Sequence, residues 1–304
     1  MTNNYPIPGK LNLGLAIMLT GALITILWAA GQVNDWWAVA LLAVAYGILM
    51  NTGYALFHEA EHNLFHPNKR INNFVGVALG FFFPAPFHLL RQGHLGHHMR
   101  NRSDDEAFDF YFEGENPVWK HLQLYGILTG LFWVVIVLSN VLAALNPAWL
   151  GNKKVKFDRA TEALQETLNP KYLRLIQLEA IFIILAHAAA IYFWRVPVLH
   201  YAVVLFGFGF MWSALQYVHH YGTTRDVQKG ARNLRTWRLL DLLWLNHNWH
   251  LNHHMSPTIP WIYLPHHGTS EERGSLTWAY LKMWRGPRFT TERVQNRYEG
   301  KIIH

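Results

Sequence analysis

Four stretches of this chain are apolar, almost free of charged residues, and long enough to cross a lipid bilayer. They cover residues 11–30, 36–57, 176–194 and 198–218. A helix of about 20 residues spans the roughly 30 Å of bilayer hydrocarbon. Only 15% of the 304 residues are charged, against about 25% in ordinary soluble domains. The sequence therefore predicts an all-α integral membrane protein with about four transmembrane helices, and it excludes a freely soluble, disordered or fibrous chain.

Two further apolar runs are poor candidates for straight spans. Residues 74–90 are short for a span and contain Pro84 and Pro86, so we expect them to dip into the interface and return. Residues 122–145 are expected to form a kinked pair of half-helices that enter and leave on the same side. A full span over residues 122–145 is the alternative.

The Lys and Arg residues indicate which side of the membrane each segment faces, because short cytoplasmic loops retain basic residues. The arrangement with residues 1–10, 58–121, 146–175 and 219–304 inside places 25 of the 26 basic residues in the cytoplasm. It predicts a cytosolic helical cap, and a bacterial inner membrane fits the lack of a targeting segment. Glu179 lies near a span end and is expected to reach the interface. Residues 1–304 are interpreted as a single domain.

Nineteen histidines, clustered along the chain, carry the functional signal, and the chain has no cysteine. The absence of cysteine excludes disulfides, thiolate metal sites and iron–sulfur clusters. Histidines three and four positions apart share a helix face and can bind one metal. Such spacings occur in three boxes, with a doublet at the end of the last span and a further histidine just before the third box. These histidines are His58 and His62; His94, His97 and His98; His250, His253 and His254; the doublet His219 and His220; and His247.

The eight box histidines and one of the doublet exceed the four ligands of a tetrahedral zinc, so two metal ions are the natural count. The residue type by itself leaves zinc, copper, iron and nickel open. His247 is a further possible ligand.

The three boxes resemble those of the membrane fatty acid desaturase and hydroxylase superfamily, over residues 56–265. That family has the patterns H-x(3,4)-H, H-x(2,3)-H-H and a second H-x(2,3)-H-H. The resemblance implies two non-haem iron ions, O2 as oxidant, and a separate electron donor of the ferredoxin, rubredoxin or cytochrome b5 type. It also implies a ninth histidine ligand: the H-x-Y-G pattern favours His219, and the H-Y-G pattern favours His220, which we prefer.

Polar residues near the boxes are candidates to orient the histidine rings or to line a substrate channel. The channel candidates are Asn51 and His187, although for His187 we favour a neutral, hydrogen-bonded packing residue. The candidates to hold the rings by hydrogen bonds are Glu59, Glu61, Asn246, Asp104 and Asp105, with Asp109, Asp226 and Asp241 as further acids.

The leading functional hypothesis is a di-iron, O2-dependent fatty acid desaturase that acts on a lipid-soluble acyl or hydrocarbon substrate. The alternatives on the same scaffold are a hydroxylase, another oxygenase, and an enzyme that forms terminal alkenes. A zinc-dependent membrane hydrolase and a metal transporter are remote alternatives. The net charge of +7 does not by itself imply nucleic acid, and we expect basic residues to face membrane lipids or an acidic electron donor. Chain length, acyl carrier, position of attack and oligomeric state stay open.

Overall fold

The computed structural model describes residues 5–150, 159–268 and 273–297 of the chain. Helices dominate this part, and two pairs of very short parallel strands tie distant segments together. The elements are α1 (Gly9–Ala29), α2 (Trp36–Glu61), α3 (Lys69–Phe82), α4 (Phe87–Arg100), β1 (Phe110–Tyr111), α5 (Pro117–Leu128), α6 (Leu131–Leu145), η1 (Pro147–Trp149), α7 (Arg159–Thr167), η2 (Pro170–Tyr172), α8 (Leu173–Trp194), α9 (Val198–Gln216), β2 (Leu234–Arg235), α10 (Arg238–Leu243), α11 (His250–Met255), η3 (Trp261–His266), β3 (Gly274–Ser275), α12 (Leu276–Met283) and β4 (Arg288–Phe289).

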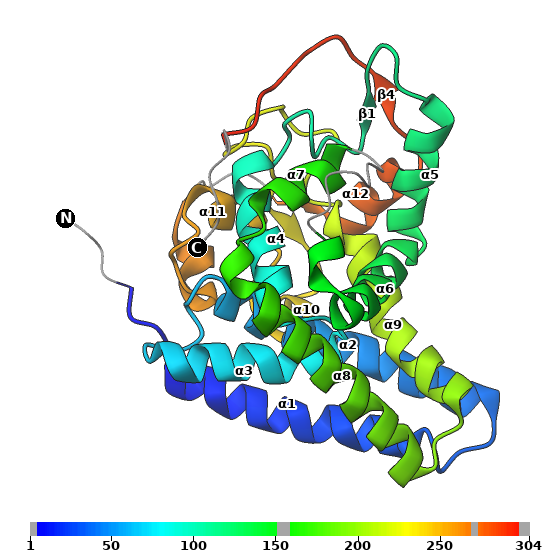
Figure 1. The fold of residues 1–304 in the computed structure, drawn as a ribbon. Coiled ribbons are helices and arrows are strands. Elements are labelled where there is room, and N and C mark those ends of the chain that lie inside the picture. The colour runs from blue at the N-terminus through cyan, green and yellow to red at the C-terminus, as the bar shows by residue number, and fades with distance from the viewer. Residues whose placement is uncertain (1–4, 151–158, 269–272, 298–304) are drawn as a thin grey trace.

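Four helices are long and apolar enough to cross a membrane, as the sequence predicts. They are α1, α2, α8 with the short turn before it, and α9. In Figure 1, α1, α2 and α8 lie in the lower part of the molecule, and α4, α11 and α12 lie in the upper part. The outer faces of the spans expose large apolar side chains such as Ile17 and Phe182, which suits contact with lipid. The architecture is that of an all-α membrane protein.

Both apolar runs that were expected to be poor spans are bent. The α3 and α4 helices meet at 99° around the Pro84–Pro86 break, and the α5 and α6 helices meet at 88°. At the second break, Gly130 has φ +92° and packs so closely on α9 that an added Cβ would lie 2.8 Å from Phe206 Cζ. Only glycine adopts this conformation without strain. The bends are therefore confirmed, and the entry and exit of each pair on the same side of the membrane stays a prediction.

The α2 and α9 helices form the closest packed pair of spans. Gly207 of α9 lies against the backbone of α2, where an added Cβ would be 2.2 Å from the carbonyl oxygen of Ala43. Gly47 of α2 lies in turn against the backbone of Gly207. Small residues let two helix backbones approach in this way. The contact fixes the relative position of the span that carries the first histidine box and the span that precedes the histidine doublet.

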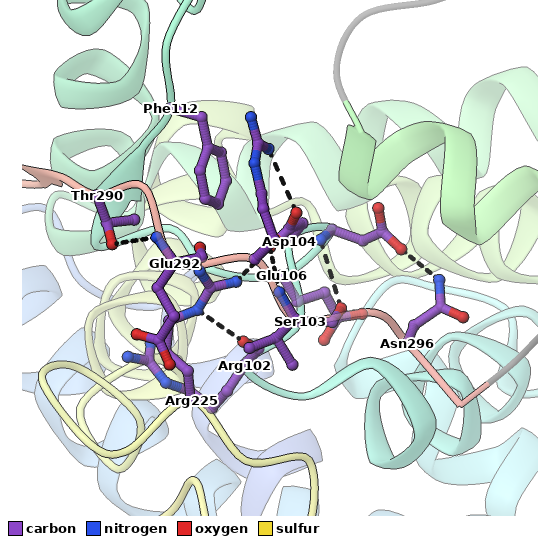
Figure 2. Close-up of polar contacts among 12 residues, drawn as sticks. Arg102, Ser103, Asp104, Glu106, Phe112, Arg225, Thr290, Glu292 and Asn296 are labelled. Atoms are coloured by element: carbon purple, nitrogen blue, oxygen red, sulfur yellow. Dashed lines mark hydrogen bonds and ion pairs between the residues drawn. The ribbon is translucent and has the colours of Figure 1, made fainter.

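The chain after α12 returns across the loop that follows the second histidine box (Figure 2). The backbone N–H of Asp104 donates to the carbonyl of Val294 at 2.9 Å, and the N–H of Val294 donates to the Asp104 carboxylate at 2.9 Å. Arg225 donates to Asp104 at 2.5 Å and to the carbonyl of Glu292 at 2.5 Å. Asn296 also donates to Asp105. Three segments that are distant in sequence are thus held together beside the second box.

Glu179 does not reach the interface as expected. Its side chain is 4% exposed. Its carboxylate accepts hydrogen bonds from the His88 ring nitrogen Nδ1 at 2.5 Å and from the His88 backbone N–H at 3.1 Å. A carboxylate buried in an apolar region is costly without partners, and the His88 contacts explain how it is accommodated. The pair ties α8 to the start of α4.

Candidate metal centre

The structure brings five histidines together at the end of α2. His58 and His62 come from the end of this helix, His94 and His98 from α4, and His253 from α11. One nitrogen from each ring lies within 4.8 Å of those of the other four. Because positions i and i+4 share one side of a helix, α2 and α4 each contribute a pair of rings to the same group. We call this set the five-histidine group.

Four more histidines form a second group beside the first. His97 comes from α4, His220 from the turn after α9, and His250 and His254 from α11. The nitrogens of these four rings also lie within 4.8 Å of one another. The second and third boxes are therefore each divided between the two groups. The rings of His98 and His254, one from each group, have centroids 4.5 Å apart. We call this set the four-histidine group.

The nitrogens in both groups are spaced as ligands of one ion would be. The Nε2 atoms of His62 and His94 are 2.8 Å apart, and those of His98 and His253 are 3.0 Å apart. In the four-histidine group, the Nε2 atoms of His220 and His250 are 3.0 Å apart. Two imidazole nitrogens bound to one ion at about 2.1 Å and at right angles stand about 3 Å apart. The residues thus fit a pair of metal ions.

Unpaired nitrogen atoms also suit a metal site. The Nε2 atom of His58 is buried without a hydrogen-bond partner among the described residues. Burial lowers the pKa of His250, His253 and His254 well below 6.5, and neighbouring histidines lower it further. These rings are therefore neutral at pH 7, and a neutral imidazole offers a lone pair to a metal.

Two of the four rings in the four-histidine group are oriented by hydrogen bonds from Nδ1. His220 donates to the carbonyl of Gly230 at 2.9 Å, and His97 donates to the carboxylate of Glu106 at 2.6 Å. A neutral ring that donates through Nδ1 keeps its lone pair on Nε2. These bonds therefore fix which nitrogen can face an ion.

Glu106 is a functional candidate that the sequence analysis missed. It also accepts a hydrogen bond from Arg100 Nε at 2.8 Å. Burial alone would raise the pKa of Glu106, but the charge of Arg100 and the hydrogen bonds from His97 and Arg100 lower it to about 2. The carboxylate is ionised at pH 7. In the sequence, Glu106 is only a carboxylate nine positions after His97. This spacing does not follow the three- and four-residue pattern of a helix face, so it did not indicate a contact.

The structure separates the two histidines of the doublet. His220 belongs to the four-histidine group. His219 lies beside it, with its ring centroid 4.7 Å from that of His250, and its Nδ1 donates to the carbonyl of Arg232 at 3.1 Å. His219 belongs to neither group. The geometry therefore favours His220, although the assignment of all nine histidines as ligands stays a prediction.

His247 also lies outside both groups, but it faces them. Its ring centroid is 4.9 Å from that of His58 and 5.3 Å from that of His250. Together with His219 it borders a pocket beside the histidines. The lining residues are Asn51, Tyr54, Trp212, Leu215, Gln216, His219, Trp244, His247, Asn248 and Leu276. Asn51 thus lies where a substrate channel was expected.

His187 lies elsewhere, between α8, α9 and the end of α3. Its Nε2 donates to the carbonyl of Phe81 at 2.9 Å, and its Nδ1 accepts from Tyr201 at 2.7 Å. It does not line the pocket described above. These two hydrogen bonds favour the packing interpretation of His187.

The acids and the amide expected to orient histidine rings mostly have other partners. Asp104 and Asp105 bind the C-terminal segment (Figure 2), and Glu106 takes the place expected for them. Glu59 accepts from the backbone of Trp261 at 3.2 Å, and Asn246 donates to the Trp261 carbonyl at 3.4 Å. Both side chains thus hold the backbone of Trp261, and neither bond is to a histidine.

The remaining acids, Glu61, Asp109, Asp241 and Asp226, differ in their hydrogen-bond partners. Glu61 is buried, and one of its oxygens has no hydrogen-bond partner among the described residues. Asp109 accepts a hydrogen bond at 2.7 Å from the hydroxyl of Tyr217, which lies two positions before His219 in the chain. Asp241 accepts a hydrogen bond at 3.0 Å from the side chain of Asn248, which lies two positions before His250 in the chain. Asp226 accepts from the backbone of Gln228 and Lys229 in a turn. Asp109 and Asp241 therefore support the segments that carry histidines.

A family model described as "Fatty acid desaturase" matches residues 35–286, which include all nine histidines of the two groups. The matched region runs from the start of α2 to beyond α12, so it covers three of the four candidate spans and both bent pairs.

Proposed function

The chain belongs to the fatty acid desaturase family, and from this membership we propose that it is an O2-dependent, di-iron oxidoreductase that introduces a double bond into a fatty acyl chain. Membership supports the coarser class, a desaturase- or hydroxylase-type oxidoreductase in a membrane. The observation that carries the proposal of a two-metal centre is the pair of adjacent histidine groups, with nitrogens spaced as ligands.

Iron is proposed because the reaction requires a redox-active metal. Removal of hydrogen from an unactivated C–H bond needs a strong oxidant, and Zn2+ has no redox chemistry. When bound, iron supplies the electron transfer to O2 that such a reaction requires. The five-histidine group would hold one ion and the four-histidine group the other.

The electron balance requires a partner. Loss of two hydrogens from adjacent carbons gives two electrons, and reduction of O2 to two waters takes four electrons and four protons. The other two electrons and two protons must come from outside the substrate. We propose a separate ferredoxin, rubredoxin or cytochrome b5 type of donor, which approaches a cytoplasmic, basic face of the protein.

The chain's own residues hold the histidine rings and the substrate in position. The ionised carboxylate of Glu106 holds the His97 ring, and the Gly230 carbonyl holds the His220 ring. The pocket that His219 and His247 border would hold the acyl carbons beside the two groups. The position of a carbon in this pocket would decide which hydrogen is removed.

A hydroxylase is the second candidate. The pocket contains the polar side chains of Asn51, Gln216 and Asn248 in addition to aromatic ones. The side-chain NH2 groups of Asn51 and Asn248 donate to the Gly47 carbonyl and to Asp241, and their amide oxygens can in addition accept a hydrogen bond from a substrate or product that carries a hydroxyl group. This polar lining is the observation that supports oxygen insertion, or the formation of a terminal alkene from a fatty acid, as an alternative to desaturation.

Product analysis tests the proposal. Cells that express the wild-type chain or His97→Ala are fed deuterated fatty acids, and their lipids are analysed by mass spectrometry. His121→Ala is the matched control, because His121 lies outside both groups and its ring bonds to the Pro117 carbonyl. Desaturation predicts a product two hydrogens lighter in the wild type and in the control only. A product that gains oxygen would replace desaturation by hydroxylation. If no product forms with any of the electron donors supplied, both proposals are overturned.

A further inference from the structure

We propose that α10 and α12 insert into the lipid leaflet on the histidine side, and that a membrane-dissolved substrate enters the pocket sideways between them. The route of entry rests on the proposed function, because it assumes a lipid substrate. The membrane contact of the two helices does not depend on the reaction and can be tested separately.

Both helices expose large apolar side chains. On and before α10, Trp237 is 81% exposed, Leu239 68% and Leu242 55%. On α12, Trp278 is 65% exposed and Leu281 49%. The exposure of tryptophan and leucine side chains would be unfavourable if this surface faced water. Tryptophan and leucine on one helix face are typical of helices that lie in a membrane interface.

The position of α10 along α2 sets its depth. The hydroxyl of Thr52 in α2 donates to the carbonyl of Leu243, the last residue of α10, at 2.5 Å. Trp37, at the other end of α2, is 68% exposed and suits the far interface. The 15 residues from Trp37 to Thr52 rise about 22 Å along the helix. This is less than the roughly 30 Å of hydrocarbon, and a tilt of α2 would reduce it further. The end of α10 therefore lies within the leaflet.

The charges around this surface are complementary to lipid headgroups. Four basic residues are exposed here: Arg235 in β2, Arg238 at the start of α10, Lys282 in the last turn of α12, and Arg285 just after it. The single acid of the two helices, Asp241, faces inward and pairs with Arg273 at 2.8 Å. Exposed basic residues beside apolar ones bind anionic lipids at an interface. These charges suit an anionic lipid surface, and the exposed tryptophan and leucine side chains between them favour lipid over an acidic soluble partner.

The two helices start side by side and border the pocket. Strands β2 and β3 pair in parallel, Leu234 with Gly274 and Arg235 with Ser275, and each strand runs into one of the helices. Trp244 directly follows α10 and Leu276 begins α12, and both line the pocket. The same pocket is lined by His219 and His247, which contact rings of the two groups. A path therefore leads from the leaflet between α10 and α12 to the histidines.

The absence of cysteine from the chain makes single-cysteine labelling a clean test. Leu239→Cys and Trp278→Cys are labelled with a nitroxide in vesicles of phosphatidylethanolamine and phosphatidylglycerol. Collision with O2, which concentrates in lipid, is compared with collision with a water-soluble nickel complex. Ile17→Cys, on an exposed face of α1, is the lipid control, and Gln295→Cys, exposed near the C-terminus, is the water control.

We expect both test labels to collide more often with O2, as the Ile17 label does. If either label collides with the nickel complex as often as the Gln295 label, the surface is aqueous and the proposal is overturned; a protein partner would then be its occupant.

The entrance is tested by narrowing it. Leu276→Trp enlarges a side chain at the mouth of the pocket, and Thr277→Trp places the same side chain on the exposed neighbour. We expect Leu276→Trp to lower the conversion of palmitate in vesicles at least tenfold with the iron content unchanged, and Thr277→Trp to have no such effect. Equal rates in the two variants would overturn the entrance. If the parent protein converts no lipid at all, the proposed function fails, while the label collisions still decide whether α10 and α12 lie in the leaflet.

Discussion

Glu106 illustrates how one residue can control a histidine site from outside it. Its carboxylate connects His97 of the four-histidine group to Arg100. A carboxylate that accepts from a histidine fixes the ring and makes its other nitrogen a stronger ligand. No comparable carboxylate contact is present for the five-histidine group among the described residues. The two groups therefore differ in how firmly their rings are held.

The first prediction concerns this difference. Glu106→Gln removes the negative charge and is expected to weaken iron binding in the four-histidine group about 10–100-fold, with the five-histidine group unchanged. After dialysis against a chelator, the variant should retain one iron per chain where the wild type retains two, as measured by elemental analysis. Glu113→Gln, at an exposed position, is the control. Two irons in Glu106→Gln under the same conditions would contradict the prediction.

The second prediction separates the doublet. His220→Ala should lose the iron of the four-histidine group, whereas His219→Ala should keep both irons and change only substrate binding, because His219 borders the pocket. Iron content and the KM for the fatty acid measure these two effects. The reverse result, with iron lost from His219→Ala and kept by His220→Ala, would show that the geometry misassigns the ninth ligand.

At the scale of elements, the site depends on the contact between α2 and α9. The first histidine box ends α2, and the doublet follows α9. Gly47 and Gly207 let the two backbones touch, so the ends of both helices are held at a fixed separation. Any shift between these spans would move His220 relative to the boxes. The glycines therefore belong to the site's architecture, although they lie about three helical turns before the histidines.

The third prediction uses this contact. Gly207→Ala places a Cβ against the Ala43 carbonyl, and the backbone of α2 has to move. Overpacking of this kind costs about 1–3 kcal/mol, so the thermal midpoint of the purified protein should fall by several degrees. Gly14→Ala is the control, since a Cβ at Gly14 in α1 meets nothing within 4 Å, and alanine is the better helix former. Equal midpoints for the two variants would be inconsistent with a close α2–α9 contact.

At the scale of the whole molecule, the histidine groups are junctions between otherwise separate parts. The five-histidine group joins α2, α4 and α11, and the four-histidine group joins α4, α11 and the turn after α9. The ends of the spans α2 and α9 thus meet the histidine-bearing helices α4 and α11, which we call the cap, at the two groups. A ligand that binds only the folded state stabilises that state by mass action. Metal binding and folding of the cap should therefore be coupled.

The fourth prediction follows from this coupling. Removal of iron with a chelator should lower the thermal midpoint of the wild-type protein, and iron added back should restore it. At a free metal concentration 100 times the Kd, one site contributes about 2.7 kcal/mol. Zn2+ should restore the midpoint but not lipid oxidation, because imidazole nitrogens bind zinc and zinc has no redox chemistry. If stripped and iron-loaded proteins melted at the same temperature, the groups would not be metal sites that support the fold.

The sequence by itself determined the class of the protein and the residues of interest. Apolar runs report spans directly, because every backbone polar group in lipid must be satisfied within a helix. The prolines at 84 and 86 indicated the first bend correctly. Histidine spacing along a helix is local information, and all nine preferred histidines lie in the two groups. These features depend on neighbours along the chain, so they can be predicted without a fold.

The tertiary structure alone decided how distant segments combine. The division of each H-x-x-H-H box between two groups depends on how α4 and α11 face each other. The contact of Glu106 with His97 and the binding of Asp104 and Asp105 to the C-terminal segment depend on loop paths (Figure 2). The burial of Glu179 against His88 depends on the packing of α8 against α4. Such contacts arise between residues far apart in sequence, where no periodicity constrains them. Local patterns fix what each segment can form, and packing decides which side chains meet.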